Sequence, residues 1–312
     1  MKTMKYYSIP ETDLRVSSII MGCMRIGGLT GKELESLIKI YLDNGVNFFE
    51  HADIYGGGEC EKAFGKAVDL KSSIRDRMII QGKCAIRKEN GKSYYDFSKA
   101  HILSSVDAIL ERLKTDYLDV LLLHRPDSLM EPAEVAEAFC RLKESGKVRY
   151  FGLSNANTMQ IELLQKACLD KLLFDQVQIG LGHTNIFDSG IAMNTDLRQG
   201  IDSTGSLLEY TRLKGITLQA WSPLQYGMFK GVILNDPAYE ELNKMLAALA
   251  EKFSTTKAAI AIAWILRHPA GIQVICGSTK QVHVDEYCAA TDIQLSRAEW
   301  YALYQAAGNI IP

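Results

Sequence analysis

Residues 118–153, LDVLLLHRPDSLMEPAEVAEAFCRLKESGKVRYFGL, contain the pattern that decides the fold. Two apolar runs of strand length, Leu118–Leu123 and Val148–Leu153, flank Pro132–Ser145, which has helical periodicity. The helix is expected to end at Ser145-Gly146, because glycine readily adopts the positive φ that follows a last helical turn. A strand, a crossover helix and a second strand in this order are typical of a parallel βαβ unit.

The same alternation continues from one end of the chain to the other. It predicts six more strands, at Ser18–Met21, Asn47–Glu50, Met78–Gln81, Phe174–Gln178, Gly215–Ala220 and Gln273–Cys276. Helices are predicted between them, among others at Lys32–Asn44, Cys60–Val68, Lys99–Leu113 and Met159–Ala167. Eight parallel strands favour a closed (β/α)₈ TIM barrel, an α/β fold, over an open doubly wound sheet. Gly22, Gly27 and Gly28 also lack the Gly-x-Gly-x-x-Gly spacing of an open dinucleotide-binding sheet.

Segments at both ends lie outside this alternation. Lys5–Val16 has two extended arms around a Pro-Glu-Thr-Asp turn, which predicts a hairpin that plugs the bottom of the barrel. After the last strand, extra C-terminal helices are expected near Gln281–Ala290 and Ser296–Ala307. No linker or low-complexity stretch divides the chain, so residues 1–312 are predicted to form a single domain.

The composition excludes several classes of partner. The 35 basic and 37 acidic residues are well mixed, with a formal charge of −2, so no nucleic-acid partner is predicted. No apolar run approaches the roughly 18 residues of a membrane span. The N-terminal sequence MKTMKYYSIPETD has no apolar segment followed by a cleavage site. The seven cysteines include no Cys-x-x-Cys pair, so reduced thiols and no metal site are expected. We therefore predict a cytoplasmic protein without a membrane partner.

Polar residues gather where the predicted strands end, which is where TIM-barrel enzymes place their active sites. Glu50 and Tyr55 follow the second strand, Lys83 the third and His124 the fourth. A phenol has a pKa of about 10 and needs a nearby cation, here Lys83, to be an effective acid. Glu50 would hold the Lys83 ammonium, and His124 would donate a hydrogen bond to a carbonyl oxygen. The four residues predict hydride addition to a carbonyl, with Tyr55 as the general acid.

Five strings at successive strand ends make the prediction more specific. They are NFFEHADIYG at 47–56, IIQGKC at 79–84, LLLHRPD at 121–127, FGLSNA at 151–156 and QAWSPLQYG at 219–227. In order and spacing they resemble the motifs of the aldo-keto reductase superfamily, and the likeness runs from about residue 5 to residue 290. The resemblance implies a barrel enzyme that reduces aldehydes, ketones, dicarbonyls or quinones, with NADP(H) or NAD(H) as cofactor.

The resemblance also implies roles for individual residues. Tyr55 falls on the general acid, Lys83 on its lysine partner and His124 on the active-site histidine. Ser154, Asn155 and Gln178 fall where the family binds the nicotinamide carboxamide, and Trp221 where an aromatic ring stacks on the nicotinamide. Ser222 and Leu224 fall along the pyrophosphate. The adenosine end of the cofactor is expected on the loop after the last strand, at Gly277, Ser278, Thr279, Lys280, His283 and Glu286.

Two positions depart from the family pattern. Glu50 stands where the family usually has aspartate, so its carboxylate is one methylene longer. Family members that prefer a cofactor with a 2′-phosphate generally carry basic residues at the positions of Gly277 and His283. Lys280 remains nearby as a lysine that can bind the phosphate. The preference between NADPH and NADH is therefore left open. Arg25, after the first strand, is a further candidate for contact with cofactor or substrate.

Two alternative functions stay open at this stage. The first is a dinucleotide-binding regulatory subunit with little catalytic activity, which the change at Glu50 favours. The second is a barrel enzyme acting on sugar phosphates, although the stretch from Trp221 to Gly231 only faintly resembles a glycine-rich phosphate loop. The substrate is expected to be chosen mainly by the long segment Gly180–Ser206, and the oligomeric state is not predicted.

Overall fold

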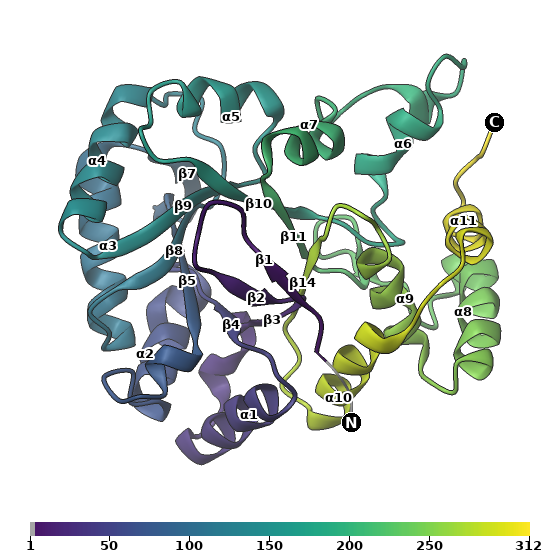
Figure 1. Cartoon of the computed structure of the whole chain (residues 1–312), viewed down its shortest axis with the longest axis horizontal. Helices are drawn as coiled ribbons and strands as arrows, with labels where there is room; N and C mark the ends of the chain where they lie inside the picture. The colour runs from purple at the N-terminus through teal and green to yellow at the C-terminus, as the bar shows by residue number, and fades with distance from the viewer. Residues whose placement is uncertain (1–3) are drawn as a thin grey trace.

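Eight parallel strands form a closed barrel in the computed structural model, which describes residues 4–312 (Figure 1). Each strand pairs in parallel with the next in sequence order, and the last pairs with the first, with Val274 beside Ile19. The predicted TIM barrel is therefore confirmed. The strands are β3 (Ile19–Gly22), β4 (Phe48–Glu50), β5 (Ile79–Cys84), β8 (Leu118–Leu123), β9 (Val148–Ser154), β10 (Leu172–Gln178), β11 (Thr217–Trp221) and β14 (Gln273–Cys276).

Helices surround the barrel and cover its outer face (Figure 1). Several begin at side chains that accept a hydrogen bond from the first turn; Thr30 and Asn157 each form a complete capping box. The helices between strands are α1 (Gly31–Asp43), α2 (Glu59–Ala67), α3 (Lys99–Leu113), α4 (Pro132–Glu144), α5 (Thr158–Gln165), α6 (Asn185–Ile191), α7 (Leu207–Lys214), α8 (Glu240–Lys252) and α9 (Lys257–Leu266). After β14 follow α10 (Gln281–Ala289) and α11 (Arg297–Ala306), the two C-terminal helices that were predicted.

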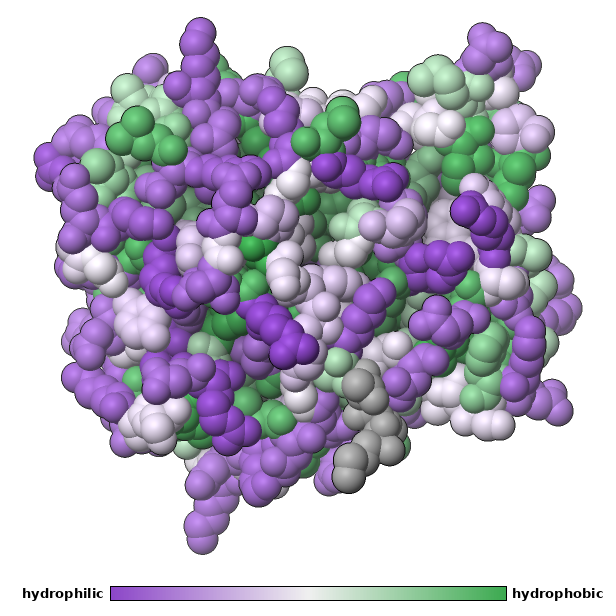
Figure 2. Space-filling model, viewed as in Figure 1, coloured by the Kyte–Doolittle hydropathy of each residue, from purple (hydrophilic) through white to green (hydrophobic). Residues whose placement is uncertain are grey.

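The N-terminal hairpin closes one end of the barrel, as predicted. Its strands, β1 (Tyr6–Ser8) and β2 (Arg15–Ser17), pair antiparallel and lie across the barrel opening (Figure 1). Ile9, Leu14 and Val16 are buried with the inward-facing apolar side chains of the barrel strands. The hairpin lies over the barrel axis (Figure 1), and the surface seen from the same side is largely hydrophilic with scattered hydrophobic patches (Figure 2). The site must therefore lie at the opposite end.

A chain of buried glutamines crosses the barrel interior, and the sequence did not reveal it. Gln81 and Gln176 both donate to the Gln219 side-chain oxygen, at 3.0 and 3.1 Å. Gln219 donates to Gln273 at 3.1 Å, and Gln273 donates to the Ser17 carbonyl at 2.8 Å. Because buried amides are costly unless they are hydrogen-bonded, this network ties β5, β10, β11 and β14 together inside the barrel.

Two small hairpins at the open end were not predicted. The first consists of β6 (Ile86–Glu89) and β7 (Lys92–Tyr95), and the second of β12 (Gln225–Tyr226) and β13 (Gly231–Val232). Their strands are short and largely exposed, so they lack the apolar runs that marked the barrel strands. Among residues 4–312, no helix combines the length and apolar character needed to cross a membrane.

The packing of α2 against α3 gives a test of this architecture. A β-carbon on Gly65 would lie 2.6 Å from the carbonyl oxygens of Arg112 and Leu113, closer than real contacts allow. We expect Gly65→Ala to lower the free energy of unfolding by about 1–3 kcal/mol, measured as a shift of the urea midpoint. Gly31→Ala is the control, because nothing lies within 4 Å of its β-carbon position. Equal midpoints for the two variants would contradict this packing.

Candidate active site

A cavity of about 820 Å³ lies at the open end of the barrel, where the strands end. It brings together 14 of the predicted site residues, from β4 at one side to α10 at the other. These are Glu50, Tyr55, His124, Ser154, Asn155, Trp221, Ser222, Leu224, Gly277, Ser278, Thr279, Lys280, His283 and Glu286. Lys83 is buried beneath the cavity floor, and Gln178 lies just outside, where its amide nitrogen donates to the Gly227 carbonyl at 3.0 Å.

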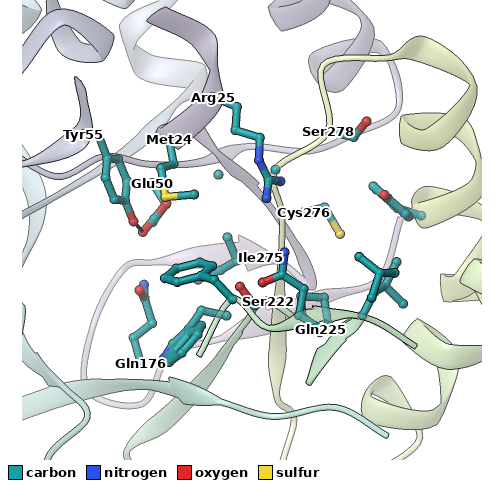
Figure 3. Close-up of a pocket in the computed structure, with 18 of the residues that line it drawn as sticks. Met24, Arg25, Glu50, Tyr55, Gln176, Ser222, Gln225, Ile275, Cys276 and Ser278 are labelled. Atoms are coloured by element: carbon teal, nitrogen blue, oxygen red, sulfur yellow. Dashed lines mark hydrogen bonds between the residues drawn. The ribbon is translucent and has the colours of Figure 1, made fainter. Parts of the chain in front are cut away.

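Glu50 joins the other members of the predicted proton-transfer group. The Tyr55 hydroxyl donates to Glu50 Oε1 at 2.8 Å, as Figure 3 shows. The same carboxylate oxygen forms an ion pair with the Lys83 ammonium, and both side chains are buried. The Lys83 ammonium also lies 4.8 Å from the centre of the Tyr55 ring. The longer glutamate side chain thus reaches both the lysine and the phenol.

The strands explain why these groups meet. Glu50 is the last residue of β4 and pairs with Gln81 of β5, which places its side chain next to the C-terminal half of β5. The sequence pattern placed Lys83 after the third strand, but β5 continues to Cys84, and Lys83 lies within it beside Leu122 of β8. Tyr55 begins a short turn in which Gly56 has a φ of 58°, a conformation that glycine adopts without strain.

Burial controls the ionisation of this group. It raises the pKa of the Tyr55 phenol well above its ordinary value, so the hydroxyl keeps its proton. It lowers the pKa of Lys83, and the contact with the Glu50 carboxylate acts in the opposite direction. Burial also lowers the pKa of His124, helped by the charges of Lys83 and Arg125, so His124 is a neutral imidazole. Its ring centre lies 6.0 Å from that of Tyr55.

Trp221 is held at the cavity wall by a chain of hydrogen bonds. Its indole nitrogen donates to Asn155 Oδ1 at 3.0 Å, and the Asn155 amide nitrogen donates to Ser154 Oγ at 2.8 Å. Ser154 Oγ in turn donates to the Gln176 carbonyl at 2.8 Å. Asn155 has a φ of 59°, which is uncommon outside glycine and which aims its amide across the mouth. The network fixes the orientation of the indole and of the Asn155 amide.

A second group of polar residues lies where β14 ends. Ser278 Oγ and His283 Nδ1 are 2.9 Å apart, and the Lys280 backbone nitrogen donates to Ser278 Oγ at 3.2 Å. Arg25 points into the cavity between Met24 and Ser278 (Figure 3). Its Nη1 lies 3.6 Å from where a β-carbon on Gly277 would be. A cation from the β3 loop therefore stands beside the position at which the family carries a basic residue.

Several residues at the site were missed or left open by the sequence pattern. Gln176, Arg125 and Phe229 line the cavity, although their spacing gave no signal for it. His51 and Asp53, which flank Glu50 and Tyr55 in the sequence, do not line it. His51 packs edge-on against Phe64 at 4.5 Å, and burial lowers its pKa to about 3. In residues 4–312 no group of three or more His, Cys, Asp or Glu side chains is placed to hold a metal ion.

Comparisons with known proteins identify the family to which this fold belongs. The profile of the Aldo/keto reductase family matches residues 18–307. The "Uncharacterized oxidoreductase YcsN" of Bacillus subtilis is 36% identical over 96% of this chain and 97% of its own length. The "6-dehydroglucose reductase" of Agrobacterium fabrum is 31% identical over 94% of this chain and 95% of its own. The crystal structure of the thermostable aldo-keto reductase Tm1743 with the inhibitor epalrestat has a TM-score of 0.77 at 25% identity, covering 97% and 100% of the two chains.

The chain belongs to the aldo/keto reductase family. It is thus an oxidoreductase built on the barrel of that family, which confirms the resemblance seen in the five sequence strings.

The buried pair of Glu50 and Lys83 yields a stability prediction. Glu50→Gln should lower the free energy of unfolding by up to about 3–5 kcal/mol, because the ammonium would stay buried without its counter-charge. Lys83→Met should be similarly costly. The double variant Glu50→Gln/Lys83→Met should be less destabilised than the sum of the single variants, since neither charge is then left alone. Urea unfolding of all four proteins measures this coupling, and simple additivity would contradict the pairing.

Proposed function

We propose that the protein is an NADPH-dependent carbonyl reductase that converts aldehydes or ketones, such as dicarbonyls and quinones, to alcohols with Tyr55 as the general acid. The observation that carries this proposal is the Tyr55 hydroxyl at the cavity, bonded to a Glu50 carboxylate that is ion-paired with Lys83. The neutral His124 beside it adds a hydrogen-bond donor for a carbonyl oxygen. The name of the 6-dehydroglucose reductase points to reduction of a carbonyl compound as well.

The residues around the cavity fit a nicotinamide dinucleotide. The fixed indole of Trp221 offers a flat surface for the nicotinamide. The donors of Ser154 and Asn155 are bonded to the Gln176 carbonyl, to Ser154 Oγ and to the His124 carbonyl, so a carboxamide would have to exchange with one of these partners to bond to them. The amide nitrogen of Gln178 is already used by Gly227, so its oxygen is the atom left for the carboxamide. The backbone from Ser222 to Leu224 would line the pyrophosphate, and the residues after β14 would hold the adenosine. When bound, the reduced nicotinamide supplies the hydride.

The protein's own residues then stabilise the charge that develops on the substrate. Hydride addition places negative charge on the carbonyl oxygen, and His124 and Tyr55 are the donors aimed at that charge. Tyr55 delivers the proton, and the buried Lys83 ammonium favours the tyrosinate that remains. Glu50 keeps the ammonium in place and in its charged form. The apolar walls formed by Ile54, Ile86 and Phe229 limit access of water to the reacting atoms.

The decisive experiment follows the decay of reduced-nicotinamide absorbance with a quinone and a panel of aldehydes, using NADPH and NADH in parallel. Tyr55→Phe should lower kcat by about 10²–10⁴-fold, the usual contribution of a general acid. Its affinity for NADPH, measured by quenching of tryptophan fluorescence, should stay close to that of the wild type. Loss of NADPH binding together with activity would mean that Tyr55 shapes the site instead of donating a proton.

Absence of turnover in the wild type, with tight NADPH binding, would instead support a dinucleotide-binding regulatory protein. In that case the elongated carboxylate at Glu50 would be the first residue to change, and Glu50→Asp should restore reduction.

Arg25 is proposed to supply the positive charge that Gly277 does not. Its guanidinium is close to Gly277 and forms no ion pair within residues 4–312. Together with Lys280 it would bind the 2′-phosphate that distinguishes NADPH from NADH.

Arg25→Ala should therefore raise the Kd for NADPH about tenfold or more, the value of a hydrogen bond to a charged group, and leave the Kd for NADH nearly unchanged. Titrating both dinucleotides into both proteins measures this difference. An equal loss for the two would place Arg25 on the pyrophosphate, which they share.

A further inference from the structure

Arg125 is a cation of the cavity to which neither the family likeness nor the proton-transfer chemistry gives a role. It follows His124 directly, lines the cavity and is half-buried. Its guanidinium carbon lies 5.7 Å from the centre of the Trp221 ring, so the arginine is held against the wall of the site. The side chain therefore lies along the cavity wall beside Trp221.

The guanidinium has no counter-charge within the described part of the chain. No carboxylate between residues 4 and 312 forms an ion pair with it, and no hydrogen bond from it is formed there. The nearby Asp127 is already engaged, since its two carboxylate oxygens accept from the backbone nitrogens of Phe97 and Leu129 at 2.9 and 2.8 Å. Glu50 is engaged by Lys83 and Tyr55. A positive charge in a largely apolar cavity is costly to leave uncompensated.

The cations of the cavity fall into two groups. Arg25 and Lys280 belong to the side where β14 ends, and Figure 3 places Arg25 beside Ser278, across the cavity from Tyr55. Arg125 belongs to the other group, beside His124 and Trp221. If the first group binds the phosphates of the dinucleotide, Arg125 is left for the second reactant. This step rests on the proposed function.

We infer that the substrate is an aldehyde or ketone that carries a carboxylate, and that Arg125 binds this carboxylate while Tyr55 and His124 bind the carbonyl oxygen. The planar guanidinium presents paired donors that match the two oxygens of a carboxylate. A single arginine suits a monoanion, whereas a phosphate dianion would call for more than one cation on this side. His124 is neutral and Lys83 is paired, so neither adds a second free charge.

The test uses two pairs of aldehydes that differ in the carboxylate: succinic semialdehyde against butanal, and 4-carboxybenzaldehyde against 4-methylbenzaldehyde. Two chain lengths are used because the distance between the carbonyl and the carboxylate is not assumed. In the wild type, kcat/KM should favour the carboxylate member of at least one pair by about tenfold or more, the value of a charge-assisted contact. In Arg125→Leu this ratio should fall to near one, and Arg125→Lys should retain part of it.

Arg87→Leu is the matched control. It removes the same charge from β6, next to the cavity residue Ile86, but Arg87 does not line the cavity and is paired with Asp96 at 2.8 Å. It should keep the wild-type ratio. If Arg87→Leu also lost the preference for the carboxylate substrates, the overall electrostatic field of the cavity mouth, and not Arg125, would select the anion. That result would overturn the inference.

The remaining outcomes separate this inference from the function on which it rests. If both members of each pair are reduced equally well by the wild type, or if the preference survives in Arg125→Leu, the inference fails while the reductase function stands. If neither aldehydes nor quinones are reduced while NADPH binds, the proposed function fails and this inference fails with it.

Discussion

The pairing of β14 with β3 is the constraint on which the rest of the molecule depends. It joins Val274 near the end of the chain to Ile19 near its beginning and closes the sheet into a barrel. In a closed barrel of parallel strands, all carboxyl ends meet at one rim. Residues more than 200 positions apart in the sequence can therefore line one cavity, as Arg25 and Gly277 do. The hairpin at the other end leaves this rim as the place where chemistry is built.

Most of the barrel could be predicted from the sequence, because each buried strand is a short apolar run bounded by helical stretches. Leu118–Leu123 and Gln273–Cys276 have the same bounds in the structure as in the prediction. The rim residues could be found for a related reason: a polar side chain directly after a buried strand has few positions other than the rim. His124, which follows β8 directly, is of this kind.

Three features of the structure could not be predicted from the sequence. The approach of Arg25 to Gly277 depends on how far a side chain extends, and spacing along the chain contains no such information. The hairpins β6–β7 and β12–β13 have too little apolar sequence to be distinguished from loops. The glutamine chain was also hidden, since a glutamine inside a barrel strand reads as a polar interruption of an apolar run.

The distribution of charge over the cavity follows a simple division. The Glu50–Lys83 pair is neutral as a unit and lies at the floor, where charge would be most costly. Two arginines that form no ion pair within residues 4–312 lie around it, Arg25 on one side and Arg125 on the other. A neutral floor between two positive walls leaves the overall field of the mouth attractive to anionic reactants.

The single hydrogen of the Tyr55 phenol has a consequence for timing. In the structure it points to the Glu50 carboxylate, and a hydroxyl with one hydrogen cannot donate to two acceptors at once. A neutral carbonyl is a weaker acceptor than a carboxylate, so before reaction the phenol favours the carboxylate. Once negative charge builds on the substrate oxygen, that oxygen becomes a competitive acceptor and the hydrogen can turn toward it. In the proposed reaction, the contact with Glu50 would thus link release of the Tyr55 proton to arrival of the hydride, and a site without substrate would keep the phenol bonded to the carboxylate.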